Sequence, residues 1–176
     1  MQQTILALAA ILAFSMFALN QHRATADVEH TANVSELELA ATDVARQRLL
    51  EIAGFAFDDA DVGRSGLRTD ETGLTPAANF GLGGDAGEDA SSLPDDLDDF
   101  HGITDSVAVN WHGTDVQVLV ASSVRYVQMD APDRAAASAT LAKEITVLAV
   151  NLTNVNRPVV SRLVQVVTPA WKAIHG

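Results

Sequence analysis

Cysteine is absent from this chain of 176 residues, and lysine is almost absent. Without cysteine, the fold can have neither a disulfide nor a thiolate metal site. The lysines are Lys143 and Lys172, and 11 basic side chains stand against 23 acidic ones, which gives a net charge of −12. Because nucleic-acid binding needs a basic surface, this balance argues against a nucleic-acid partner. An acidic surface of this kind is typical of adaptation to high salt, which is the favoured interpretation. The alternative is that the acidic surface has a function of its own.

The first third of the chain carries an uncharged apolar run from Thr4 to Leu19, without proline or glycine. As a helix, the run would span about 24 Å, slightly less than the roughly 30 Å hydrocarbon core of a membrane. Three interpretations stay open. The run is a signal peptide cleaved after Ala24-Thr25-Ala26, although Met1-Gln2-Gln3 is not basic; or it is a plain membrane anchor. In the third, it is the helix of a filament subunit, held in the bilayer before assembly and in a helical bundle afterwards.

A second pattern continues this run as far as Gly54. Apolar residues recur there at spacings of three and four, which predicts an amphipathic helix. The stripe consists of Leu37, Ala41, Val44, Ala45, Leu49, Ile52 and Ala53. Gly54 is suited to follow the end of a helix. The sequence therefore predicts one long helix over 1–54, apolar first and amphipathic later, which serves membrane insertion and assembly.

The remaining chain changes character twice. The segment 55–94 is rich in glycine and aspartate and has no extended periodicity, so we expect a long, irregular, solvated loop. In 95–176 the apolar period becomes two, with runs over 107–111, 116–129, 145–150 and 159–167. Four strands joined by short turns predict an antiparallel meander that packs on the long helix as a head domain. The fold class is therefore α+β.

The sharpest local motif is the acidic octet, Asp95-Asp96-Leu97-Asp98-Asp99-Phe100-His101-Gly102. Its four carboxylates, those of Asp95, Asp96, Asp98 and Asp99, are oxygen ligands of the kind that Ca²⁺ prefers. The competing interpretation is a solvated acidic turn whose carboxylates cap local backbone N–H groups. The sequence alone leaves the calcium site and the acidic turn both open, and the octet is the candidate metal site of this chain.

Other candidate motifs are weaker. Asp59-Ala60-Asp61-Val62-Gly63 has part of a calcium loop but lacks its closing Glu. His101 and His112 could act as a pair, but a turn residue and a strand-end residue are the simpler interpretation. Gly81-Leu82-Gly83-Gly84 is better explained as a flexible loop than as a phosphate cradle, and Trp111 is predicted to be a core residue. No spacing typical of a catalytic site is found, so we expect a non-enzymatic protein without a cofactor.

The order of these elements resembles that of type IV pilins and pseudopilins. The octet is similar to the D-D-x-D-D-[FY]-x-G segment that precedes the sheet in minor pilins of the mannose-sensitive haemagglutinin type. Lys143-Glu144-Ile145-Thr146-Val147 and Pro158-Val159-Val160-Ser161 are also similar to the last two strands of that group. In two respects the chain departs from the family pattern. No basic leader ending in Gly precedes the apolar run, and no Glu occurs before Glu29, whereas the family carries an early Glu.

The resemblance implies a subunit of a cell-envelope filament or secretion apparatus. Its helix, Ile5 to Leu19, would lie in the inner membrane as a single pass, with the head outside the cytoplasm. During assembly into a surface filament, the same residues would contact other pilin-like subunits or further copies of the chain. The alternative is a membrane-anchored or secreted binding module with an acidic, Ca²⁺-binding loop.

Overall fold

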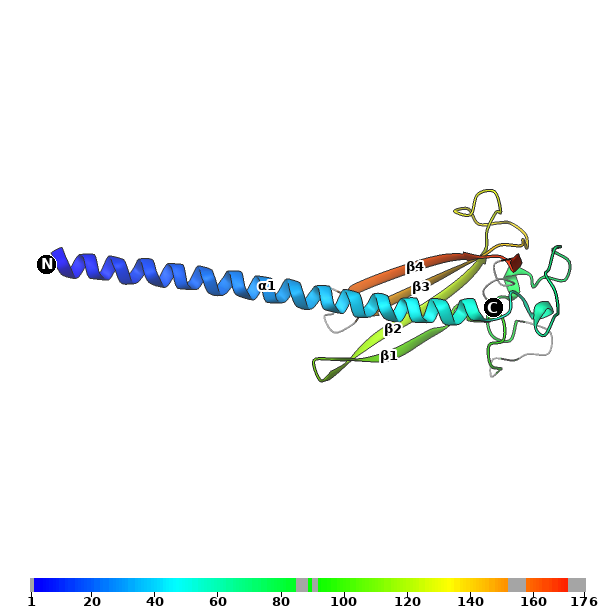
Figure 1. Ribbon diagram of the computed structural model, residues 1–176, viewed down its shortest axis with the longest axis horizontal. Helices are drawn as coiled ribbons and strands as arrows, with labels where there is room; N and C mark the ends of the chain where they lie inside the picture. The colour runs from blue at the N-terminus through cyan, green and yellow to red at the C-terminus, as the bar shows by residue number, and fades with distance from the viewer. Residues whose placement is uncertain (1, 85–88, 90–91, 152–157, 171–176) are drawn as a thin grey trace. The chain divides into compact units, whose positions relative to one another are not determined.

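The computed structural model describes residues 2–84, 89, 92–151 and 158–170. It divides into two compact units, Met1–Leu37 and Glu38–Gly176, which are described separately. The elements are one long helix, three short 3-10 helices and four strands (Figure 1). In chain order these are α1 (Gln2–Gly54), η1 (Asp59–Asp61), η2 (Ala77–Asn79), η3 (Asp98–Phe100), β1 (Thr104–Trp111), β2 (Thr114–Tyr126), β3 (Lys143–Asn151) and β4 (Val159–Val167).

Helix α1 is continuous over the length that the sequence predicted and ends at Gly54. No proline or glycine interrupts it before that residue. Ser15, Thr25 and Thr31 each donate their hydroxyl proton to the carbonyl four residues earlier, an arrangement that a helix tolerates at small cost. Helix formation therefore agrees with local sequence from end to end, whether or not a segment packs against anything else.

The four strands form one antiparallel sheet in the order β1-β2-β3-β4, a simple meander. The β1–β2 hairpin closes with Trp111 opposite Thr114. The two residues between them, His112 and Gly113, both have positive φ, at 49° and 82°. A two-residue turn of this kind matches the natural twist of paired strands. His112 is thus a turn residue rather than a strand-end residue, and β1 separates it from His101, so the two do not form a pair.

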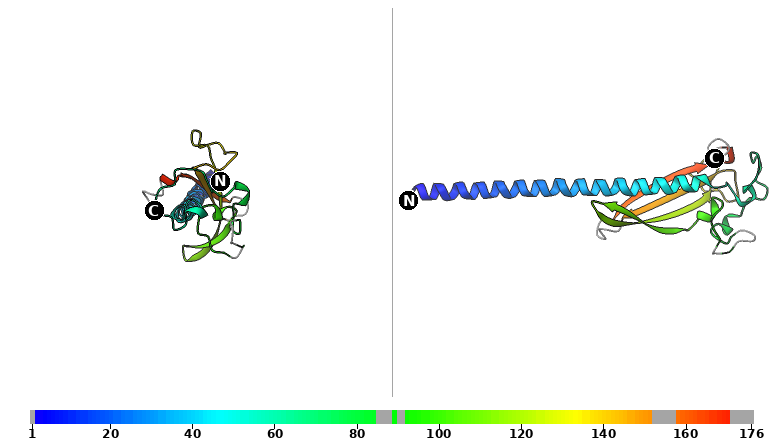
Figure 2. Two further views of the ribbon diagram at one scale, coloured as in Figure 1. Left: turned by 90° about the vertical axis from the view of Figure 1, so that its right-hand side faces the viewer. Right: turned by 60° about the horizontal axis from the view of Figure 1, so that its bottom comes forward.

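The core of the second unit lies between the last turns of α1 and one face of the sheet (Figure 2). Ala41, Ala45 and Ile52 are fully buried on α1, and Val118, Ile145 and Val147 are fully buried on the strands. Thr42 on the same part of the helix donates a hydrogen bond to Ser161 of β4, at 3.1 Å. The α+β architecture with a four-stranded meander on the helix is confirmed, and the predicted helical stripe faces the sheet.

Three local expectations were wrong. Trp111 is only partly buried, because it ends an edge strand beside the exposed turn. Strand β2 stops at Tyr126. The run over 116–129, expected to stay extended as far as Met129, therefore ends early, and Val127 is fully buried, where its N–H donates to Ala142 O at 3.0 Å. The segment 55–94 is also less solvated than expected. The Arg68 side chain is buried there and donates to both carboxylate oxygens of Asp61, at 2.9 and 2.8 Å.

Candidate functional site

A buried lysine lies at the centre of the second unit. Lys143 is the first residue of β3, and its side chain points to the same face of the sheet as Ile145 and Val147. Its relative exposure is 0 %. An unpaired ammonium in such a place would be very costly, so the surrounding acceptors determine whether the fold tolerates it.

All three ammonium protons of Lys143 have acceptors. Its Nζ donates to Phe57 O at 2.6 Å, to Asp58 Oδ2 at 3.1 Å and to Asp98 Oδ1. Both carboxylates are as deeply buried as the lysine. The result is a buried ion-pair group that ties three separate parts of the chain together: the residues after α1, the acidic octet and the start of β3.

Asp58 is held from several directions. Its Oδ2 accepts from the Thr75 N–H at 3.0 Å and from the Tyr126 hydroxyl at 3.4 Å, besides Lys143. The single proton of the Tyr126 hydroxyl is shared with Thr75 O, which lies closer, at 2.9 Å. Several donors on one oxygen stabilise the charged carboxylate. Asp58 therefore acts as a fixed anion that orients Lys143.

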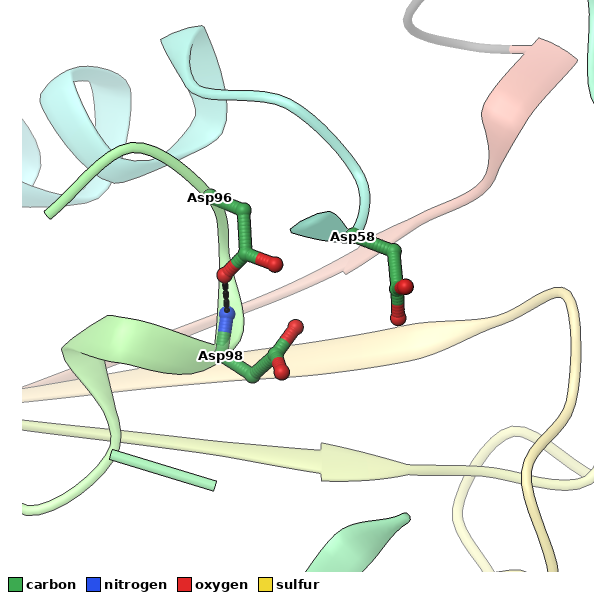
Figure 3. Close-up of side chains that lie close together, drawn as sticks. All are labelled: Asp58, Asp96 and Asp98. Atoms are coloured by element: carbon green, nitrogen blue, oxygen red, sulfur yellow. Dashed lines mark hydrogen bonds between the residues drawn. The ribbon is translucent and has the colours of Figure 1, made fainter. Parts of the chain in front are cut away.

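The acidic octet is folded inward rather than solvated. A parallel bridge joins Asp96 to Ala56, and the Leu97 N–H donates to Ala56 O at 3.0 Å. Asp96 Oδ1 accepts from the backbone N–H groups of Asp98 and Asp99, at 2.8 and 3.2 Å. Figure 3 shows the first of these bonds, with the carboxyl groups of Asp58, Asp96 and Asp98 gathered together. Aspartate side chains therefore cap local N–H groups, as one interpretation of the octet required, but they do so in the interior.

Three aromatic rings surround the ammonium. The Lys143 Nζ lies 4.8 Å from the ring centroid of Phe57, 5.2 Å from that of Phe80 and 5.3 Å from that of Tyr126. The Phe80 and Tyr126 rings also contact each other, with centroids 5.0 Å apart. These rings offer their faces to a cation and exclude water from it. The cluster is therefore both charged and dry.

The glycines beside Phe80 serve this packing. Gly81 has a φ of 106°, and its N–H donates to Asp98 O at 2.9 Å. A Cβ on Gly84 would overlap the Asn79 carbonyl oxygen, at 1.5 Å. In the segment we had interpreted as a flexible loop, the described glycines permit a close turn that brings Phe80 over the cluster.

Negative charge exceeds positive charge in the cluster. Four carboxyl groups are buried here, those of Asp58, Asp96, Asp98 and Asp99, with one ammonium. Burial, and then the charge of Asp98, raise the pKa of Asp96 to about 8. Burial also raises the pKa of Asp98, although the Lys143 charge opposes that shift. Asp96 therefore carries a proton at neutral pH, and this relieves part of the repulsion.

The four predicted calcium ligands do not share one environment. Asp95 is exposed, and Asp99 Oδ2 accepts from the Asp95 N–H at 2.9 Å. Asp96 and Asp98 instead come together with Asp58, with one carboxylate oxygen of each within 4.8 Å of the others. Lys143 is hydrogen-bonded to two of the three, so its ammonium supplies a positive charge of the kind a metal ion would bring. Calcium binding by the octet stays a prediction, and a cation would have to compete with Lys143.

Lys143 and Asp58 were missed as members of a site. One signal was present in the sequence, since the period of two over β3 places Lys143 in register with Ile145, Val147 and Ala149. A lysine at a core position requires buried acids as partners. That reasoning would have found the lysine, and it would have pointed to the octet as one source of its partners.

The first unit presents a different surface. Every large apolar side chain from Ile5 to Leu19 is more than half exposed, from 56 % at Leu19 to 73 % at Phe14. Among the described residues, α1 is a helix long and apolar enough to cross a membrane.

Comparison with known proteins adds no identification: no family model, curated protein or solved structure matches this chain.

Proposed function

We propose that this protein is a non-enzymatic, pilin-like subunit of a cell-envelope filament or secretion apparatus. The observation that carries the proposal is the exposed apolar stretch of α1, from Ile5 to Leu19, in the same unbroken helix whose last turns form the core with the sheet. A helix satisfies its own backbone hydrogen bonds, so this stretch can lie in lipid without loss. The sequence resemblance to type IV pilins supports the same interpretation.

Assembly would use the same surface as membrane insertion. Helices in a lipid environment associate through close packing at small residues. The apolar stretch supplies these, with Ala9 and Ala13 four residues apart and Ser15 bonded back to Ile11 O at 2.8 Å. In the proposed cycle, the stretch leaves the bilayer and packs against neighbouring subunits. The unit Glu38–Gly176 stays outside the membrane throughout.

Site-specific photocrosslinking tests this proposal. A photoreactive amino acid replaces Phe14 in the apolar stretch, and a matched probe replaces Met129, which is 61 % exposed in the second unit. In cells that assemble the structure, the Phe14 probe should form adducts with another copy or with a second envelope protein, and far more often than the Met129 probe. Adducts with lipid alone would contradict assembly and favour the plain anchor.

A further inference from the structure

We propose that Lys143 and Asp98 become joined by an intramolecular isopeptide bond between the lysine Nζ and the aspartate Cγ. The geometry that points to this bond is the direct contact of Lys143 Nζ with Asp98 Oδ1 at a position where both side chains are completely buried. The two residues lie 45 positions apart in the chain. The bond would therefore link the acidic octet covalently to the start of β3.

Proximity is the first requirement for such a reaction. An amine and a carboxyl group held in contact behave as though each were present at about 10⁵–10⁸ M. Lys143 is fixed by Phe57 O and Asp58 as well as by Asp98. Asp98 is fixed in turn by its position in η3, where the N–H of His101 donates to its carbonyl at 2.9 Å. The amine and the carboxyl group are therefore already positioned for reaction in the folded protein.

Exclusion of water is the second requirement. In water, hydrolysis opposes amide formation from an ammonium and a carboxylate. The rings of Phe57, Phe80 and Tyr126 enclose the ammonium.

Proton transfer is the third requirement, and the neighbouring carboxyl groups supply it. Asp58 Oδ2, at 3.1 Å from Nζ, accepts a proton from the ammonium and leaves a neutral amine. Asp96, which has a carboxyl oxygen within 4.8 Å of one of Asp98, donates its proton to the Asp98 carboxyl and makes Cγ electrophilic. Its raised pKa supports this role.

The chemical balance closes without another reactant. The amine lone pair attacks Asp98 Cγ, a C–N bond forms and a C–O bond breaks. The nitrogen then gives its second proton to Asp96, and the proton on Asp58 passes to the departing hydroxyl group. One carboxyl oxygen therefore leaves as water with two protons, and Asp58 and Asp96 return to their starting states. The net change is one ammonium plus one carboxylate to one amide plus one water, so the charge of the cluster is unchanged. Phe57 O, already 2.6 Å from Nζ, remains as an acceptor for the amide N–H.

Asp98 is a better target than Asp58, the other carboxylate in contact with the ammonium. Asp58 Oδ2 accepts from the Thr75 N–H and the Tyr126 hydroxyl, and these bonds stabilise its charged, unreactive form. Asp98 Oδ2, by contrast, has no hydrogen-bond partner in the part of the chain that the structure describes. Asp58 is therefore the base, and Asp98 is the electrophile.

Intact-mass spectrometry of the full-length chain in a mild detergent tests the proposal. The folded wild-type protein should weigh one water molecule less than its sequence. Digestion should yield a branched peptide pair that contains Asp98 and Lys143, identified by fragmentation. The full sequence mass in the wild-type protein would overturn the proposal.

Variants locate the bond. Lys143→Arg keeps the positive charge but provides no amine for this reaction, so it should show the full sequence mass, and so should Asp98→Ala. Asp96→Asn should reduce the fraction of dehydrated protein, because it removes the proton donor and keeps the side-chain shape. Loss of one water that persists in Lys143→Arg would place the dehydration elsewhere and overturn the assignment. The wild-type measurement decides the question even where a variant fails to fold.

Discussion

Replacement of Lys143 by methionine is the perturbation whose effect follows most directly from the structure. Methionine fills a similar volume but provides no charge and no donor. The buried carboxylates of Asp58 and Asp98 would then lose their common cation. Removal of one partner from a buried ion pair costs about 3–5 kcal/mol, because the remaining charge has neither water nor counter-ion.

A matched control lies nearby in the same sheet. Arg125 pairs with Glu144 through two hydrogen bonds, at 2.8 and 2.9 Å, but its side chain is 46 % exposed. The Glu144 carboxylate is 8 % exposed and keeps a hydrogen bond from the Thr146 hydroxyl, at 3.3 Å, when Arg125 is removed. A half-exposed pair of this kind contributes less than a fully buried one. Arg125→Met should therefore lower the free energy of unfolding by far less than Lys143→Met, although both variants remove one cation from the sheet.

The assay is thermal and urea unfolding of the full-length chain in a mild detergent, followed by near-ultraviolet circular dichroism. We expect Lys143→Met to lower the Tm by roughly 6–20 °C, since 1 kcal/mol corresponds to about 2–4 °C in a chain of this size. The double variant Lys143→Met/Asp98→Leu should recover part of the loss, because it replaces buried charges by apolar groups. If Lys143→Met cost no more than Arg125→Met, the idea of an essential buried cation would be refuted.

Four further predictions concern the helix and the cluster. Ile52→Ala should cost about 2–5 kcal/mol in urea unfolding because it opens a cavity, whereas Leu50→Ala, at a site 61 % exposed, should change stability by less than about 0.5 kcal/mol. The pKa of Asp96 is about 8 in the folded protein and its ordinary value is 3.8, so the folded state holds the Asp96 proton more tightly than the unfolded state. The stabilisation from this proton is complete below about pH 4 and is lost as the pH rises through 8. The free energy of unfolding in urea should therefore fall between pH 6 and 8, by at most about 1.4 kcal/mol per pH unit, and Asp96→Asn should flatten that slope. Leu12→Arg should weaken membrane association by about 2.5–3.5 kcal/mol in a vesicle flotation assay, and unchanged flotation would argue against insertion. If the octet binds calcium, the Tm should rise with CaCl₂ but not with NaCl of equal ionic strength, and equal curves would exclude that binding.

Much of the fold could be predicted because it depends on local periodicity. The stripe through Ala41, Ala45 and Ile52 needs only helical geometry, and the helix ends at Gly54, where the periodic pattern stops. The strands likewise follow from alternation. Where local periodicity predicted the wrong structure, a tertiary contact determines it instead. Val127 is the example, because it lies beyond the end of the β2 ladder and is buried under a turn.

The site was harder to predict because its parts are distant in the chain. Lys143 lies 85 positions from Asp58 and 45 from Asp98, and no spacing rule connects them. The octet was interpreted either as a calcium site or as a solvated turn, because acidic residues normally lie at the surface. Its burial depends on the backbone bridge between Ala56 and Asp96, which cannot be foreseen from either segment alone.

Mass spectrometry of the native protein from sheared surface filaments and from membranes tests the central claim most directly, because it identifies the N-terminus of the mature chain. If the chain assembles through α1, its mature form must retain Ile5 to Leu19 and must occur in the filament fraction. A mature chain that begins at Asp27, after removal of the apolar stretch, would contradict the account.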